Sequence, residues 1–142
     1  RTDFAAFIPL ADLPMAMTAH VVFSALDPAQ PATTSATIIE QVIRGSIGFQ
    51  GLLMSDDVSM NALAGSIAER TRAIVAAGCD VVLHCNGKLE EMREVASQTP
   101  ELSGQALARA VKALASRKPP VPFDRAAARA ELDALVGQAG VV

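Results

Sequence analysis

The chain has 142 residues, carries a formal net charge of −3 and is 51% hydrophobic. This length and composition suit one globular domain with its own core and exclude an intrinsically disordered chain. The small negative charge argues against nucleic acid or an anionic membrane as a partner, and no apolar run approaches the roughly 20 residues that a bilayer-spanning helix needs.

The chain begins with an irregular segment and a first predicted strand. Residues 1–14 are expected to form a loop that leads into a short helix, because prolines interrupt this segment. Residues 15–23 (MAMTAHVVF) follow as a strand that is apolar on both faces and holds a lone histidine, His20. Such strands are typical of a parallel sheet with helices packed outside it.

A helix is predicted next, after a proline-containing loop. Thr33 or Thr34 can cap it, and it is expected to run from Ser35 to about Gly45. Its apolar residues fall on one helical stripe, which predicts a face that packs on the sheet: Ile38, Ile39, Val42 and Ile43.

A turn, a strand and two carboxylates form the most informative stretch of the chain. Gly51 marks the turn, residues 51–57 are predicted as a central strand, and Asp56 and Asp57 lie where it ends. Active sites of α/β folds lie at the C-terminal ends of strands. Side chains alternate along a strand, so the two carboxylates cannot both face one cavity. One is a candidate for chemistry and the other for the following turn, and alternation alone does not choose between them.

The chain then alternates helix and strand once more. Ser66 is expected to open a helix that runs through Ala77 and is closed by Gly78. Residues 79–85 (CDVVLHC) are predicted as a third apolar strand, and residues 88–97 as a charged, exposed helix.

The end of the chain is predicted to be helical. Ser103 can cap a helix over residues 103–117, and residues 118–122 (KPPVP) form a stiff linker. A last helix is expected from Phe123 to about Val136.

The thiols and histidines predict neither a disulfide nor a metal site. Cys79 and Cys85 are the two cysteines of the chain, which fits a reducing cytosol. Neighbouring His84 and Cys85 point to opposite faces of a strand, and no Cys-x-x-Cys spacing occurs. We therefore expect no metal and no cofactor.

Three βα units in succession predict parallel strands joined by right-handed crossovers. An open three-stranded sheet has two raw edges, whereas an eight-stranded barrel has none. We therefore interpret residues 1–117 as the last part, about strands 6–8, of a (β/α)8 TIM barrel. Residues 118–142 are expected to be a proline-rich linker and a C-terminal helix that packs on the barrel. The remaining N-terminal part of the barrel would be supplied by the same or another polypeptide.

The amino-acid sequence of several segments resembles that of bacterial β-N-acetylglucosaminidases (β-N-acetylhexosaminidases) of glycoside hydrolase family 3. The segments PMAMTAHV (14–21), IRG through GFQG (43–51), MSDDVSM (54–60) and DVVLHCNG (80–87) carry the resemblance, which covers roughly residues 3–117. The family usually has Leu where this chain has Val58. The Ser-Asp-Asp-x-Ser-Met block is quite specific, and it resembles the strand that holds the family's nucleophile.

The resemblance implies a function for this chain. It implies a cytoplasmic, retaining exo-enzyme that removes terminal β-linked GlcNAc from peptidoglycan fragments, GlcNAc-anhydroMurNAc peptides, during cell-wall recycling. By resemblance Asp56 is the nucleophile, and Met60 is a candidate for contact with the sugar. His20 either lines the pocket, as a substrate-binding residue, or bonds a neighbouring backbone group. The family's general acid/base lies on an upstream loop that nothing in this chain matches.

Two other hypotheses about the function of the chain remain open. The nearest rival enzyme is a family 3 β-glucosidase, although the doubled Asp56-Asp57 and the following Ser59-Met60 favour the N-acetylglucosaminidase branch. From a different class, the chain could be a non-catalytic fragment that only completes a barrel, since it keeps a nucleophile and shows no acid/base.

Overall fold

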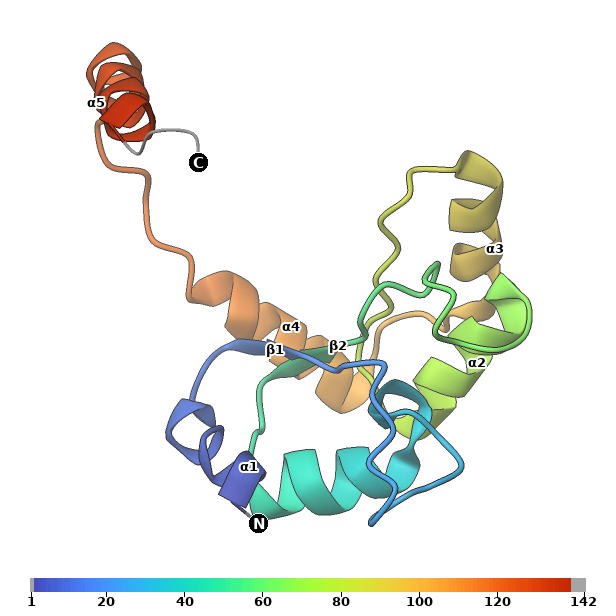
Figure 1. Cartoon of the computed structure of the whole chain (residues 1–142). Helices are drawn as coiled ribbons and strands as arrows, with labels where there is room; N and C mark the ends of the chain where they lie inside the picture. The colour runs from blue at the N-terminus through green and yellow to red at the C-terminus, as the bar shows by residue number, and fades with distance from the viewer. Residues whose placement is uncertain (1, 139–142) are drawn as a thin grey trace.

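A short parallel sheet lies at the centre of the computed structural model, which describes residues 2–138. Strand β1 (Met15–Met17) follows two short helices, α1 (Thr2–Ala5) and η1 (Ile8–Leu10), and pairs with β2 (Leu52–Met54). Met15 lies opposite Leu52, and Met17 lies opposite Met54. Figure 1 shows the two strands side by side in the middle of the molecule. Arg1 and residues 139–142, the end of the predicted 118–142 segment, lie outside the described residues.

The third predicted strand pairs with β2 but is reduced to a single bridge, Met54 with Val81. The backbone N–H of Asp80 donates to the carbonyl of Leu53 at 2.8 Å. Farther along, the N–H of Leu83 donates to the hydroxyl of Ser55 at 2.9 Å, so a side chain replaces the backbone carbonyl and the ladder stops. The predicted parallel order is thus confirmed. The predicted lengths, 15–23, 51–57 and 79–85, are too long, because pairing ends within three residues in β1 and β2.

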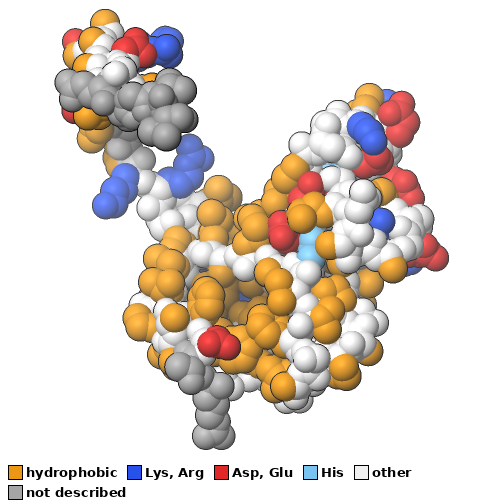
Figure 2. All heavy atoms as spheres, in the orientation of Figure 1, with side chains coloured by type: hydrophobic (Ala, Val, Ile, Leu, Met, Phe, Trp, Pro, Cys, Tyr) orange, Lys and Arg blue, Asp and Glu red, His pale blue; other side chains and the backbone are white. Residues whose placement is uncertain are grey.

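Helices cover one face of this sheet, and the other face is covered only in part, since Leu52 of β2 is 8% exposed there. Leu53 is fully buried and packs in a cluster with Ile39 and Ile74 from the flanking helices. On the opposite face, Met15 and Met17 are 50% and 51% exposed. Figure 2 shows apolar side chains gathered over much of the visible face of the main body. The sheet is therefore well covered on one face and only partly covered on the other.

The helix between β1 and β2 is wider than an α-helix. A 3₁₀ turn, η2 (Ala32–Thr34), leads into η3 (Ile38–Ser46), which has π-helical hydrogen bonding. The hydroxyl of Ser35 accepts the N–H of Ile38, the first residue of η3, at 3.1 Å, whereas the predicted caps Thr33 and Thr34 do not cap η3. The N-cap residue itself, Thr37, makes no side-chain capping bond. Thr33 is instead fully buried and bonded to other parts of the chain.

The remaining helices begin close to where the sequence predicts them. Helix α2 (Ile67–Ala77) starts at Ser66, which forms a capping box with Glu69, and ends at Gly78 with φ at +107°. Positive φ is a conformation that glycine adopts without strain. Helices α3 (Leu89–Gln98) and α4 (Gly104–Ala115) follow, although the side chain of Ser103 makes no capping bond to α4.

A buried carboxylate joins several of these elements at the N-terminal end of the sheet. Asp80, whose side chain is 5% exposed, pairs with Arg44 of η3 and with Arg109 of α4, each at 2.9 Å. Its Oδ2 also accepts the N–H of Leu53 in β2 at 2.8 Å. Because all these groups meet on one side chain, Asp80 fixes two helices to the sheet.

The last helix, α5 (Arg125–Gln138), extends away from the body on its linker (Figure 1). Asp124 directly precedes this helix, and its Oδ1 accepts the N–H groups of Ala126 and Ala127 in the first turn. Leu132 and Leu135 are 53% and 60% exposed. The packing of this segment on a complete barrel stays a prediction. None of the helices in residues 2–138 is long and apolar enough to cross a membrane.

Candidate active site

Asp56 lies directly beyond the C-terminal end of β2, with its backbone held and its carboxylate mostly free. Its N–H donates to the hydroxyl of Thr18, beyond β1, at 3.3 Å. Its Oδ1 accepts the N–H of Asp57 at 2.8 Å, and within residues 2–138 this is the single hydrogen bond to the carboxylate. A half-buried carboxylate with one unused oxygen is suited to reaction with a ligand.

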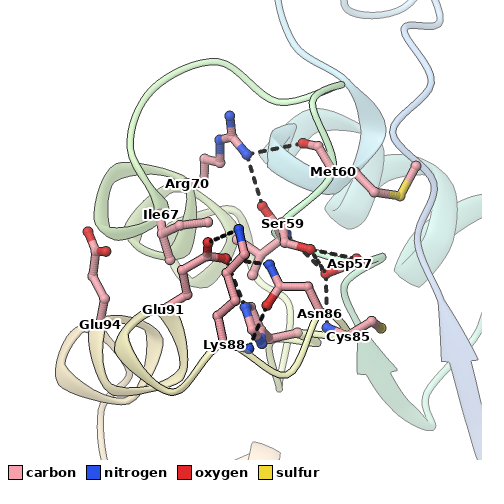
Figure 3. Close-up of polar contacts among 12 residues, drawn as sticks. Asp57, Ser59, Met60, Ile67, Arg70, Cys85, Asn86, Lys88, Glu91 and Glu94 are labelled. Carbon is pink, nitrogen blue, oxygen red and sulfur yellow. Dashed lines mark hydrogen bonds and ion pairs between the residues drawn. The ribbon is translucent and has the colours of Figure 1, made fainter.

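Asp57 has a different environment. Its Oδ1 accepts the N–H of Ser59 at 3.0 Å and the N–H of Cys85 at 3.1 Å, and the hydroxyl of Ser59 donates to both of its oxygens (Figure 3). Partial burial acts to raise the pKa of Asp57, but these hydrogen bonds outweigh it, so the pKa lies below its ordinary value. Asp57 therefore joins the loop after β2 to the loop after Val81, as the turn-forming alternative predicts.

His20 bonds to protein groups through both ring nitrogens. Nε2 lies 2.9 Å from the backbone carbonyl of Asp57, and Nδ1 lies 2.9 Å from the hydroxyl of Thr33. Of the two roles expected for this residue, the structure shows the bond to a neighbouring backbone group. The ring bonds the carbonyl of the residue that follows Asp56, and it thereby links the segment after β1 to the backbone beside the candidate nucleophile.

Met60 lies in the loop beyond Asp57 and is 44% exposed. This loop is held by Arg70 of α2, whose guanidinium donates to the carbonyls of Val58 and Met60 at 3.2 and 3.1 Å (Figure 3). The side chain of Met60 is thus available for contact on a loop of fixed backbone, and its contact with a sugar stays a prediction.

A second polar cluster lies beside this loop, around Glu91 of α3. Its carboxylate bonds Asn86 at 2.6 Å, and His84 and Lys88 at 3.1 Å each (Figure 3). The hydrogen bonds from Asn86, His84 and Lys88 lower the pKa of Glu91 to about 2. The cluster fixes residues 84–88 to α3. In the part of the chain that the structure describes, no group of three or more His, Cys, Asp or Glu side chains is arranged to hold a metal ion.

Comparison with known proteins assigns the family. A profile described as the Glycosyl hydrolase family 3 N terminal domain matches residues 2–117. The chain belongs to glycosyl hydrolase family 3. This family assignment confirms the resemblance seen in the Ser-Asp-Asp-x-Ser-Met block.

Relatives in the family carry names that agree with one another. A Beta-hexosaminidase of Alkalilimnicola ehrlichii is 50% identical over 76 residues, which cover 52% of this chain and 22% of the relative. A Beta-hexosaminidase of Vibrio cholerae is 42% identical over 99 residues, or 68% of this chain and 29% of the relative. The family 3 chain described here therefore spans about a quarter of the length of these curated relatives.

Solved structures agree with the α/β fold. The crystal structure of a Beta-N-acetylhexosaminidase from Beutenbergia cavernae aligns with a TM-score of 0.61 at 32% identity, over 81% of this chain and 36% of that chain. The beta-N-acetylglucosaminidase of Thermotoga maritima aligns with a TM-score of 0.58 at 31% identity, over 73% of this chain and 25% of that one. This family 3 chain is thus similar to part of each enzyme.

The sequence identified Asp56, Asp57 and His20, and the structure brings them together in one network. It missed Thr18 as a partner of Asp56, and it considered Thr33 only as a helix cap. A signal for Thr18 was present, because it is a polar residue in the middle of an apolar strand and is 5% exposed in the structure. The role of Arg70 had no such signal, since a charged side chain on a helix is most often solvated surface.

Proposed function

We propose that this chain forms the nucleophile side of a retaining exo-β-N-acetylhexosaminidase, with Asp56 as the nucleophile. The contrast between two adjacent carboxylates carries the proposal. Asp57 accepts bonds from Ser59 and Cys85 and holds two loops together, whereas Asp56 keeps one oxygen unused at the C-terminal end of β2. This contrast supports the choice of Asp56, which alternation along the strand left open.

The reaction would proceed in two displacements. The free oxygen of Asp56 attacks the anomeric carbon of a terminal β-linked GlcNAc, the bond to the leaving oxygen breaks, and the aglycone departs with a proton from an acid. Water then gives a proton to the conjugate base of that acid and attacks the same carbon, the bond to Asp56 breaks, and the sugar leaves with its configuration retained. The bond from the N–H of Asp57 would hold Oδ1 and leave Oδ2 to react. The acid/base would be supplied by an upstream loop.

The proposal includes a partner, the remaining N-terminal part of a (β/α)8 barrel, for which these segments would be about strands 6–8. Two features support it. The outer edge of β1 makes no strand pairing within residues 2–138, and the sheet face that carries Met15 and Met17 is half exposed. Strands added at this edge would satisfy the unpaired backbone groups, cover the methionines and enclose Asp56.

The proposed substrate class is the peptidoglycan fragment GlcNAc-anhydroMurNAc peptide, processed in the cytoplasm during cell-wall recycling. The names of the relatives support a hexosaminidase, and the match of the Ser-Asp-Asp-x-Ser-Met block to that branch of the family supports the muropeptide. Met60 would touch the sugar or its aglycone, and its exposure on the loop held by Arg70 supports this.

Substitution of the nucleophile in the full-length polypeptide tests the proposal. We expect Asp56→Ala to lower turnover of an aryl N-acetylglucosaminide by roughly 10³-fold or more, as loss of a covalent nucleophile does. Asp57→Ala is the matched variant and should keep measurable turnover, because its carboxylate holds loops rather than attacking the sugar. Near-normal turnover by Asp56→Ala would contradict the assignment.

A substrate panel separates the alternatives. Turnover of an aryl glucoside in preference to the aryl N-acetylglucosaminide would indicate a family 3 β-glucosidase. No turnover of either by a folded full-length polypeptide would indicate a non-catalytic segment that only completes a barrel.

A further inference from the structure

Four hydrogen bonds form a continuous chain from the backbone before the Asp56 side chain to the backbone after it. The N–H of Asp56 lies 3.3 Å from Thr18 Oγ1, and Thr18 Oγ1 lies 3.0 Å from Thr33 Oγ1. Thr33 Oγ1 lies 2.9 Å from His20 Nδ1, and His20 Nε2 lies 2.9 Å from the carbonyl oxygen of Asp57. Thr33 is fully buried and Thr18 is 5% exposed, so water does not compete for their hydroxyls.

The direction of each bond follows from chemistry. The carbonyl of Asp57 only accepts, so His20 must carry its proton on Nε2. In neutral imidazole Nδ1 is then an acceptor, and the hydroxyl of Thr33 donates to it. Thr33 Oγ1 is left to accept from the hydroxyl of Thr18, and Thr18 Oγ1 accepts from the N–H of Asp56. Each donor has one acceptor, and no member of the chain is left unsatisfied.

The consequence is that the peptide groups on either side of the Asp56–Asp57 peptide are fixed by the segment after β1 and by η2. The N–H of Asp56 is held on one side, and the carbonyl of Asp57 is held on the other. Between them, the N–H of Asp57 donates to Oδ1 of Asp56 itself. The orientation of the Asp56–Asp57 peptide, which the two fixed groups flank, thus determines the orientation of the Asp56 carboxylate.

We propose that His20 is a positioning residue for Asp56, acting with Thr33 and Thr18 as one hydrogen-bonded unit that aims the nucleophile. This inference rests on the proposed function of Asp56. It replaces a substrate-binding role for His20, because both ring nitrogens are already engaged with protein groups.

Three variants of the full-length polypeptide test the unit. His20→Gln can keep a donor near the position of Nε2 and hence the bond to Asp57, whereas His20→Asn keeps only an acceptor near Nδ1. Because a misplacement of about 1 Å can cost about 100-fold in rate, we expect His20→Asn to lower kcat by roughly 10- to 100-fold with KM changed less than about threefold. His20→Gln should lower kcat by a smaller factor. Thr33→Val should lower kcat in the same direction, and Thr33→Ser should recover most of that loss.

Thr34→Val is the matched control for Thr33→Val. Among the described residues 2–138, the hydroxyl of Thr34 bonds only Gln30 and the carbonyl of Pro31, which lie in its own loop. We expect this variant to keep both kcat and KM. Thermal unfolding of every variant shows whether the fold survives, and variants that unfold are compared through the milder Thr33→Ser and His20→Gln changes.

A spectroscopic measurement tests the chain independently of activity. The ¹⁵N NMR signals of His20 in the full-length polypeptide should show the tautomer with the proton on Nε2. Thr33→Val should shift the Nδ1 signal by removing its donor. A proton on Nδ1, or a KM rise with unchanged kcat in His20→Asn, would overturn the proposal.

Failure of this inference is distinguishable from failure of the proposed function. If Asp56→Ala abolishes turnover while His20→Asn retains normal kcat, only the positioning role is wrong. If Asp56→Ala retains turnover, the proposed function itself is wrong.

Discussion

The carboxylate of Asp57 accepts the backbone N–H of Cys85 at 3.1 Å, a residue 28 positions later in the sequence. The same carboxylate holds the N–H and hydroxyl of Ser59. One side chain therefore connects the two loops that follow β2 and Val81, next to the candidate nucleophile.

Removing this connection should cost stability and leave the nucleophile in place. Hydrogen bonds to charged groups contribute about 1.5–3 kcal/mol each in favourable cases and less when solvent screens them. We expect Asp57→Ala to lower the free energy of unfolding by about 1–2 kcal/mol in urea denaturation. Ser59→Ala removes only the hydroxyl bonds and should cost less. Equal stability of the wild type and Asp57→Ala would show that the loops are held by other contacts.

Asp80 should be more important for stability than any exposed ion pair. Breaking a buried ion pair by removing one partner typically costs about 3–5 kcal/mol, because the other charge is left uncompensated. Since Arg44 and Arg109 are 14% and 20% exposed, we expect Asp80→Asn to lower the free energy of unfolding by about 2–4 kcal/mol.

The control is Asp133→Asn, which breaks the exposed pair between Arg129 and Asp133. Such pairs contribute about 0–1 kcal/mol. A result in which both substitutions have the same small effect would contradict the role of Asp80.

Gly51 should not tolerate a side chain, and the reason is close approach of backbone rather than positive φ. A Cβ at this position would lie 2.7 Å from the carbonyl oxygen of Leu13 and 2.8 Å from that of Pro14. Overpacking of this kind costs about 1–3 kcal/mol, so Gly51→Ala should lower the melting temperature. Gly137→Ala should not, because within residues 2–138 nothing lies within 4 Å of the added Cβ apart from its chain neighbours and the backbone of its own helix. An unchanged melting temperature in Gly51→Ala would show that the turn moves aside freely.

Glu91 should make stability depend on pH in the acid range. Its hydrogen bonds from Asn86, His84 and Lys88 lower its pKa from 4.5 to about 2 in the folded chain. A carboxyl with a lowered folded pKa stabilises the fold above its unfolded pKa, and this contribution is lost as the pH falls through the folded value.

The difference in melting temperature between the wild type and Glu91→Gln should therefore be constant above about pH 4.5 and narrow as the pH falls toward 2. Glu90→Gln, on the neighbouring residue, makes no hydrogen bond to protein within residues 2–138 and should show no such trend. A difference that widens on acidification would contradict the bonding pattern around Glu91.

The two thiols should differ in reactivity. Burial raises the pKa of Cys79 to about 12, and its side chain is also inaccessible. Cys85 is exposed. Its pKa is also raised, because nearby atoms displace some of the water around its thiol and because Asp57 and Asp56 carry negative charges. With iodoacetamide at pH 8 and peptide mapping, Cys85 should be alkylated slowly and Cys79 only after unfolding. Asp56→Asn should speed alkylation of Cys85, because one nearby negative charge is lost. Faster modification of Cys79 than of Cys85 would contradict the structure.

Local signals in the sequence predicted the helices well. The Ser66 and Glu69 capping box and the glycine at position 78 are determined within a few residues, and α2 begins and ends as expected. The predicted cap of η3 was wrong because the hydroxyl of Thr33, a good capping residue, instead accepts a hydrogen bond from Thr18, which lies 15 positions earlier in the sequence. The predicted strands were too long because backbone pairing depends on the neighbouring strand. The hydroxyl of Ser55, and not a backbone carbonyl, accepts the N–H of Leu83, and regular pairing ends there. The different hydrogen-bond environments of Asp56 and Asp57 depend in part on the N–H of Cys85, which no local pattern reveals.

Covalent trapping of the sugar decides whether Asp56 is the nucleophile. The full-length polypeptide is incubated with a fluorinated N-acetylglucosaminyl fluoride, whose ring fluorine slows hydrolysis of the glycosyl-enzyme, and is then digested and mapped by mass spectrometry. We predict that the added mass is on Asp56, that Asp57→Asn still acquires it, and that Asp56→Asn does not. Labelling of Asp57 or of a residue outside this strand, or turnover without any adduct on Asp56, would contradict the assignment.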